Sequence, residues 1–255
     1  MKKILLVILS LFIVGVFWYF QRDENPQILS DQALNDQVIL PSSADSAKDA
    51  AADNSKEVDL LKSEALKIIS RPILVKIPIS DSSRKSALAK LDELIKLIKG
   101  KYDYVNAWYD LGAYRIVIGD YDGAIDAYKF VVLLKPGDYI SYANLGDIYM
   151  NYLKNYPLAE ENFLKAIKNN SAYFFGYTEL ATLYENNFND GKQKAEDLFL
   201  LGIKLNAENL YLKIKFAEFY ERNGKKSEAL ALFREVLSLD PNNKSVEIEI
   251  AKLLQ

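Results

Sequence analysis

The 255-residue chain contains no cysteine and no histidine. Without thiols it can form no disulfide bond and no thiolate metal site, and no lipid can be attached through cysteine. Without imidazole it lacks the commonest general base and the commonest ligand of transition metals. These two absences exclude nucleophile–histidine catalytic sites and the usual zinc sites, so the enzymatic alternative is limited to catalysis by carboxylates alone.

An excess of positive charge is also missing. Residues 1–20 contain two basic residues, and residues 21–59 contain three basic and nine acidic ones. Because the whole chain has 32 basic and 35 acidic residues, residues 60–255 contain 27 basic and 26 acidic ones. Nucleic-acid binding requires a concentrated basic surface, so we expect no nucleic-acid partner for this nearly neutral region.

A long hydrophobic run occurs at the N-terminus alone, where Ile4–Phe20 carries no charge. As a helix this run spans about 25 Å, enough for a thin or locally adapted bilayer. Its last residues, Phe17–Phe20, are aromatic and of the kind found at membrane interfaces. A cleaved signal peptide and a buried core helix are the alternatives, but aromatic residues stand where a cleavage site requires small ones. We therefore predict a transmembrane signal anchor at residues 1–20.

The charges around this run predict its orientation. Lys2, Lys3 and the terminal amine precede the run, and Arg22 is followed by Asp23 and Glu24. By the positive-inside rule, the N-terminus faces the cytoplasm and the rest of the chain lies outside it. We expect a single-pass protein of the cytoplasmic membrane with an extracytoplasmic C-terminal domain, and the short anchor and the lack of cysteine indicate a bacterial protein. A cytoplasm-facing domain is the alternative.

Residues 21–54 are rich in Ser, Asp, Ala, Asn and Gln. Such a segment buries too little apolar surface to offset its ordering entropy, which predicts a flexible acidic linker. A flexible chain of this length reaches about 30–35 Å, enough to hold a domain clear of the lipid headgroups. A short docking motif at Gln37–Leu40 is the alternative to a plain spacer.

Residues 55–104 are predicted to flank the folded domain on its N-terminal side with two helices and one extended segment. The first helix has a capping-box start at Asn54. Apolar residues then alternate with other residues over 73–79, which is typical of an extended segment with one apolar side. The second helix covers residues 82–100 and ends at a glycine.

A small residue recurs in four similar segments of the chain. It lies at Gly112, Gly146, Ala181 and Ala217, at spacings of 34, 35 and 36 residues. A second small residue is followed four residues later by an aromatic one, in the pairs Ala124–Tyr128, Ala159–Phe163, Ala195–Phe199 and Ala229–Phe233. A glycine inside a helix costs about 1 kcal/mol relative to alanine. We therefore predict that Gly146 has a packing role and lets a second helix approach closely.

The pattern resembles the tetratricopeptide repeat, whose signature is W-x2-L-G-x2-Y, then A-x3-F and P. The first unit departs from it at Arg115, which replaces an aromatic residue, and the fourth at Lys213 and Phe216. Units two and three carry one and two extra residues, which we expect at the turn between their helices. The resemblance implies an all-α helix-turn-helix solenoid of four repeats at residues 105–243 with a capping helix at residues 244–255, preceded by the single transmembrane helix.

In tetratricopeptide proteins the first helices of successive repeats line a concave groove that holds a peptide or a partner helix. The resemblance therefore implies a protein or peptide partner. The matching groove residues are Asn106, Tyr109, Ala113, Ile116, Val117, Ile140, Asp147, Met150, Thr178, Thr182, Glu185, Ile214, Glu218 and Glu221. The remaining lining positions are Ala143, Asn151, Phe175, Asn186, Tyr211 and Arg222. Chaperone-binding members clamp a C-terminal carboxylate with Lys, Arg and Asn, and these are absent at the matching positions.

The implied groove is uneven along its length. Units one and two supply mainly apolar residues, whereas units three and four supply Glu185, Glu218 and Glu221. A partner segment with a hydrophobic stretch and a Lys/Arg cluster would match both halves, and we expect the apolar half to supply most of the affinity. The alternative is that residues 73–79 fold back and fill the apolar half.

No chemistry beyond binding is expected. The Asp-containing stretches at residues 119–126 and 186–197 lack oxygen ligands at the positions that a calcium loop requires. We expect no catalytic residue, no metal, no cofactor and no small-molecule substrate. The predicted function is a membrane-anchored scaffold or adaptor that mediates protein–protein interactions at the cell envelope. A carboxylate-only envelope enzyme and a cytoplasm-facing adaptor are the alternatives.

Overall fold

The structure is a computed structural model that describes residues 44–255, with side chains from residue 55 onward. These residues form eleven α-helices and one π-helical turn, and they contain no β-strand. Residues 52–255 pack as one compact unit. None of the helices within residues 44–255 combines the length and the apolar character that crossing a membrane requires. The predicted anchor at residues 1–20 and the linker up to residue 43 lie outside the described residues.

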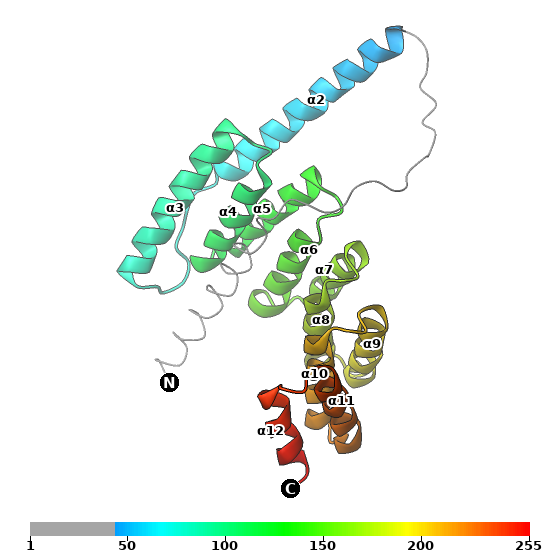
Figure 1. Ribbon diagram of the computed structural model, residues 1–255. Helices are drawn as coiled ribbons and strands as arrows, with labels where there is room; N and C mark the ends of the chain where they lie inside the picture. Colours follow the sequence, from blue (N-terminus) through cyan, green and yellow to red (C-terminus); the bar gives the residue numbers. More distant parts are fainter. Residues whose placement is uncertain (1–43) are drawn as a thin grey trace. The chain divides into compact units, whose positions relative to one another are not determined.

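Four helix pairs follow one another in chain order (Figure 1). They are α4 (Val105–Val117) with α5 (Tyr121–Leu134), α6 (Tyr139–Asp147) with α7 (Tyr156–Asn169), α8 (Phe174–Asn187) with α9 (Gly191–Leu205), and α10 (Leu210–Arg222) with α11 (Lys226–Leu239). The second helix of each pair also packs on the first helix of the next, and α12 (Lys244–Leu253) packs on α11. The described residues therefore form an all-α solenoid of helix pairs closed by a C-terminal helix.

The glycines of the first two repeats lie under aromatic rings. A Cβ atom at Gly112 would be 2.6 Å from the ring of Tyr128, and one at Gly146 would be 2.7 Å from the ring of Phe163. Real Cβ atoms do not approach other atoms so closely, because cores are already close-packed. The aromatic partner is in both cases the residue four positions after the second small residue. The predicted packing role of Gly146 is thus confirmed.

The extra residues of repeats two and three do not lengthen the turns between paired helices. In all four repeats three residues separate the two helices. In repeat two the additional residue is absorbed by the π-helical turn η1 (Ile148–Tyr152), which continues α6. In repeat three α8 extends to Asn187 and α9 begins at Gly191, where a Cβ atom would collide with the carbonyl oxygen of Tyr184. The prediction that the insertions lie in the turns is therefore wrong, because the helices themselves lengthen.

Helix α2 (Ala44–Ile69) begins ten residues before the predicted start at Asn54. That prediction is wrong, and so is the expectation that the linker extends to residue 54. The upstream sequence, ADSAKDAAAD, is rich in alanine, the residue with the highest helix propensity, and this outweighs the capping signal at Asn54. Near its C-terminal end α2 buries Ala65, Ile68 and Ile69.

Residues 71–80, which we call the strap, connect α2 to α3 (Asp81–Gly100) in an extended conformation. Its odd-numbered residues from Ile73 to Ile79 are half-buried and its even-numbered ones are exposed, which confirms the predicted alternation. The Lys76 amide donates to the Ile118 carbonyl at 2.8 Å. Helix α3 packs on α4 as the second helix of a preceding repeat would.

Candidate functional site

The helices α4, α6 with η1, α8 and α10 are the first helices of the four repeats and carry all predicted groove residues. We call their shared surface the first-helix face. Helix α8 packs directly against α10, so the first helices of repeats three and four lie side by side. A partner on this face would therefore contact several repeats at once, as the resemblance implies.

The apolar residues of the first two repeats are largely occupied by the fold. Tyr109 is buried, and its hydroxyl donates to Asp138 Oδ1 at 2.5 Å. Asp138 Oδ2 accepts from the Ser141 amide at 2.7 Å and so caps α6. Burial raises the pKa of Tyr109, and the neighbouring carboxylate of Asp138 raises it further. Tyr109 thus joins repeat one to the start of repeat two, and its ring has little surface left for a partner.

The other apolar groove positions show the same tendency. Met150 is buried, whereas Ile116, Val117, Ile140 and Ile214 are half-buried against the core. Ala113 is half-buried and Asn106 is exposed. The strap contacts the turn between α4 and α5, where Ile77 faces Gly119, and also α5 itself, where Arg71 pairs with Asp126.

The polar groove positions of repeats three and four are mostly satisfied within the chain. Thr178 is buried and donates to the Phe175 carbonyl, and the exposed Thr182 donates to the Thr178 carbonyl. Glu185 accepts from Arg222 Nη2 at 2.8 Å and from Asn223 Nδ2 at 2.9 Å. In the same way Lys215 pairs with Glu218 at 2.9 Å, whereas Glu221 is exposed.

Two other carboxylates on this face have no basic partner among the described residues. They are Asp147 on α6 and Glu179 on α8, and both are half-buried. Burial raises the pKa of Glu179 to about 7, with a further contribution from the charge of Asp147. Burial also raises the pKa of Asp147, although Asn151 Nδ2 donates to its carboxylate at 2.6 Å. Asp147 is one of the predicted groove residues, whereas Glu179 is not among the positions that match the groove of the repeat family.

Aromatic rings line the N-terminal ends of α6, α8 and α10. The ring centroids of Tyr139 and Tyr173 are 5.1 Å apart, and those of Phe175 and Tyr211 are 5.2 Å apart. Phe174 lies 4.4 Å from Phe175 and 5.4 Å from Tyr211. We call these five residues the aromatic ladder. Phe175 is 36% and Tyr211 38% exposed, so the ladder offers ring surface on the first-helix face.

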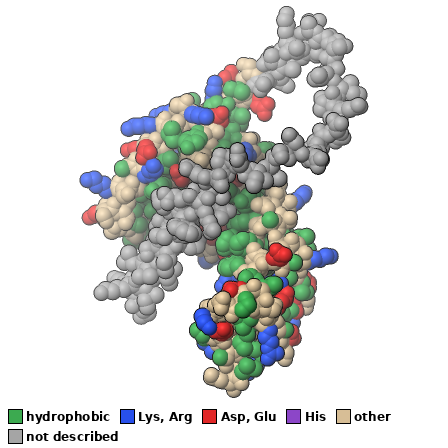
Figure 2. Space-filling view, in the orientation of Figure 1, with side chains coloured by type: hydrophobic (Ala, Val, Ile, Leu, Met, Phe, Trp, Pro, Cys, Tyr) green, Lys and Arg blue, Asp and Glu red, His purple; other side chains and the backbone are tan. Residues whose placement is uncertain are grey.

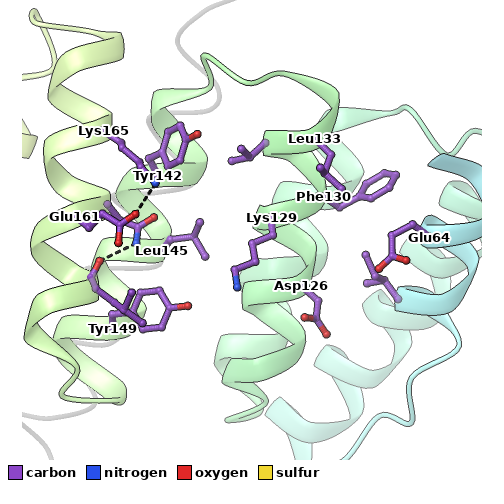
Figure 3. A pocket seen from close by; sticks show the side chains of 14 residues that line it. Glu64, Asp126, Lys129, Phe130, Leu133, Tyr142, Leu145, Tyr149, Glu161 and Lys165 are labelled. Carbon is purple, nitrogen blue, oxygen red and sulfur yellow. Dashed lines mark hydrogen bonds and ion pairs between the residues drawn. The ribbon is translucent and has the colours of Figure 1, made fainter. Parts of the chain in front are cut away.

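A second surface feature is a cleft of about 580 Å³ between α2, α5, α6 with η1, and α7. Leu133 and Lys129 of α5 stand opposite Tyr142 and Leu145, as Figure 3 shows. Glu161 and Lys165 of α7 pair with each other at 2.6 Å at its edge. The cleft therefore combines an apolar floor with charged walls.

The charges of the surface are mixed. On the face shown in Figure 2, basic and acidic side chains are interspersed among hydrophobic patches. Within the part of the chain that the structure describes, no group of three acidic residues is placed to hold a metal ion. The first-helix face thus carries exposed rings and half-buried carboxylates.

A family model for the tetratricopeptide repeat matches residues 212–243, which correspond to α10 and α11. The chain thus contains a tetratricopeptide repeat in its fourth helix pair, as the resemblance predicted. No curated protein sequence matches the chain.

In solved structures, 167 chains are similar to this one. The crystal structure of MamA is 21% identical, covers 66% of this chain and 99% of its own, and has a TM-score of 0.49. The crystal structure of TTC0263, a thermophilic TPR protein of Thermus thermophilus, is 19% identical, covers 68% of this chain and 93% of its own, and has a TM-score of 0.49. The crystal structure of YrrB, a TPR protein with an unusual peptide-binding site, is 17% identical. It covers 63% of this chain and 81% of its own, and has a TM-score of 0.45.

Proposed function

We propose that this protein is a scaffold or adaptor that binds a segment of a partner protein on its first-helix face. The observation that carries the proposal is the combination of exposed rings, Phe175 and Tyr211, with half-buried carboxylates that have no basic partner among the described residues, on one helix array. Exposed aromatic residues and desolvated charges are the groups that supply most of the binding energy at protein interfaces. The tetratricopeptide repeat in the chain fits such a role.

Site-specific photocrosslinking tests this proposal. A photoreactive amino acid replaces Thr182, which is exposed on α8, and in a matched control it replaces Lys168, which is exposed on α7. We expect a crosslinked species containing a second protein from position 182 and none from position 168. The same species from both positions, or no crosslink from position 182 in the native membrane and cytosol fractions, would contradict the proposal.

We further propose that residues 1–20 anchor the scaffold in the cytoplasmic membrane and that the repeats lie outside the cytoplasm. The uncharged run Ile4–Phe20 and its basic N-terminal flank support this. Alkaline phosphatase fused after Gln255 is expected to be active, because this enzyme folds only outside the cytoplasm. A silent phosphatase together with an active cytoplasmic reporter at the same position would favour the opposite topology.

A further inference from the structure

The half-buried carboxylates on the first-helix face fall into two groups. Glu185 and Glu218 each have a basic partner within the chain, as described above. Asp147 and Glu179 have none among the described residues, although both are half-buried. A carboxylate that is withdrawn from water without a cation is disfavoured in its charged form. This pair is therefore the point on the face where an added cation would gain most.

The surroundings of the pair come from the first helices α6 with η1, α8 and α10 and from the second helix α5. The Asp147 carboxylate accepts a hydrogen bond from Asn151; burial raises the pKa values of Tyr128 and Tyr152, and the charge of Asp147 raises them further. Glu179 lies within electrostatic reach of Asp147 and of Tyr211. Lys215 lies 5.5 Å from the Tyr211 ring centroid and is paired with Glu218. The ring of Tyr211 thus lies within electrostatic reach of Glu179, and neither carboxylate has a basic partner among the described residues.

We propose that the partner segment places an Arg or Lys side chain between Asp147 and Glu179 and lays its neighbouring residues on the Phe175–Tyr211 end of the aromatic ladder. This inference rests on the proposed function and names the chemistry of the partner. Arginine fits best, because its planar guanidinium can bond to both carboxylates and stack on a ring at the same time. The occupant is an extended protein segment with at least one cation next to apolar residues.

The chain's lack of histidine gives this binding a distinctive pH dependence. Glu179 has a raised pKa of about 7, so it changes from neutral to charged across the physiological range. No histidine competes with it in this range. A cationic segment prefers the charged form of Glu179, so its affinity rises between pH 6 and pH 8. The polar neighbours Asp147, Asn151 and Tyr211 do not reverse this sign, because none of them is a cation.

Peptide binding to the full-length chain tests the proposal. The protein is placed in nanodiscs of neutral lipid, and a fluorescent peptide of alternating Arg and Leu is titrated against one in which citrulline replaces every Arg. Citrulline keeps the shape of arginine but carries no charge. We expect the citrulline peptide to bind about tenfold or more weakly, as the loss of charged hydrogen bonds implies.

Matched variants locate the effect. The double variant Asp147→Asn, Glu179→Gln is expected to bind both peptides equally, whereas Glu161→Gln, Glu228→Gln removes the same charge from the exposed second helices and is expected to keep the difference. The rise in affinity from pH 6 to pH 8 is expected to vanish in Glu179→Gln alone. Circular dichroism of each variant confirms that it is folded.

Three results would overturn the inference. These are equal binding of the two peptides to the unmodified protein, no binding of either, and equal losses in the two double variants. In each case the crosslink from position 182 decides the fate of the broader proposal. If that crosslink persists, the face still binds a partner of other chemistry; if it is absent, the proposed function fails as well.

Discussion

Repeat one and repeat four each bury a cation where the tetratricopeptide pattern has an aromatic residue. In repeat one Arg115 is 0% exposed and pairs with Asp120, which is 1% exposed. Asp120 is also bonded to Lys76 of the strap at 3.0 Å. In repeat four the Nζ atom of Lys213 is bonded to Glu235, whose side chain is 49% exposed. The same kind of substitution is thus neutralised inside the protein at one end and at its surface at the other.

The difference follows from what covers each repeat. The strap and α3 cover repeat one, so the arginine and its carboxylate are both removed from water, and two guanidinium nitrogens of Arg115 have no hydrogen-bond partner among the described residues. Arg71 adds a further link from the strap to Asp126 of α5, at 2.5 Å. In repeat four Glu235 stays in contact with water, and the flexible lysine reaches out to it. A buried ion pair fixes the positions of its two side chains, and removing one partner is costly. Breaking a half-exposed ion pair costs little stability.

The largest effect is expected from Asp120→Asn. This change leaves the buried guanidinium of Arg115 without a counter-charge, which costs about 3–5 kcal/mol. Glu235→Gln, at the other end of the array, is expected to cost about 1 kcal/mol, because the half-exposed lysine pair is screened by water. Urea denaturation of the full-length protein measures both free energies of unfolding. Similar losses at the two ends would break the comparison.

A second test compares the cost of replacing two glycines: Gly146, which lies under an aromatic ring in repeat two, and Gly224, in the turn before α11. Gly146→Leu is expected to cost about 1–3 kcal/mol or more, because its side chain would have to displace the ring of Phe163. Gly224 has a φ of +74° and no atom within 4 Å of a Cβ position, so Gly224→Asn is expected to be nearly neutral. Equal shifts of the melting temperature in the two variants would contradict the assignment of Gly146 to the helix contact.

The smallest effect is expected on the exposed side of the array, from Glu179→Gln. A carboxylate whose pKa is raised to about 7 on folding holds its proton more tightly in the folded chain. Its contribution to stability therefore declines as the pH rises from the ordinary pKa of Glu, about 4.3, through 7. Glu179→Gln is expected to stabilise the protein at pH 8, where the carboxylate is charged, and to change its stability little near pH 4.

The exposed Glu221→Gln, on the same face, serves as the control for this measurement. It is expected to change the free energy of unfolding little at either pH. A stabilisation by Glu179→Gln that is independent of pH would show that the change acts through packing rather than through charge.

The repeat fold was predictable because each unit repeats the small and aromatic residues that its own helix contact requires. The ends of the helices were less predictable. The start of α2 and the length of the turns depend on the balance between helix propensity and local caps, which the spacing of the repeated residues does not give. The groove positions were predictable from the repeat phase, but their exposure was not. Tyr109 is buried by contacts with the next repeat, and Glu179 acquires its raised pKa from burial and from the charge of Asp147 on α6. Burial and raised pKa values of this kind depend on contacts between repeats, so the sequence of a single repeat does not predict them.

The packing of Trp108 makes its fluorescence a probe of the structure of repeat one. Its indole nitrogen donates to the Tyr102 carbonyl at 2.6 Å, and its ring centroid lies 4.3 Å from that of Phe130. The chain has two tryptophans, and Trp18 can be replaced by phenylalanine so that Trp108 alone emits. Fluorescence then follows the loss of structure at one end of the array, whereas circular dichroism sums over all helices. Because each repeat contacts its neighbours alone, the two signals can separate during unfolding, and their separation measures how far cooperativity extends along the chain.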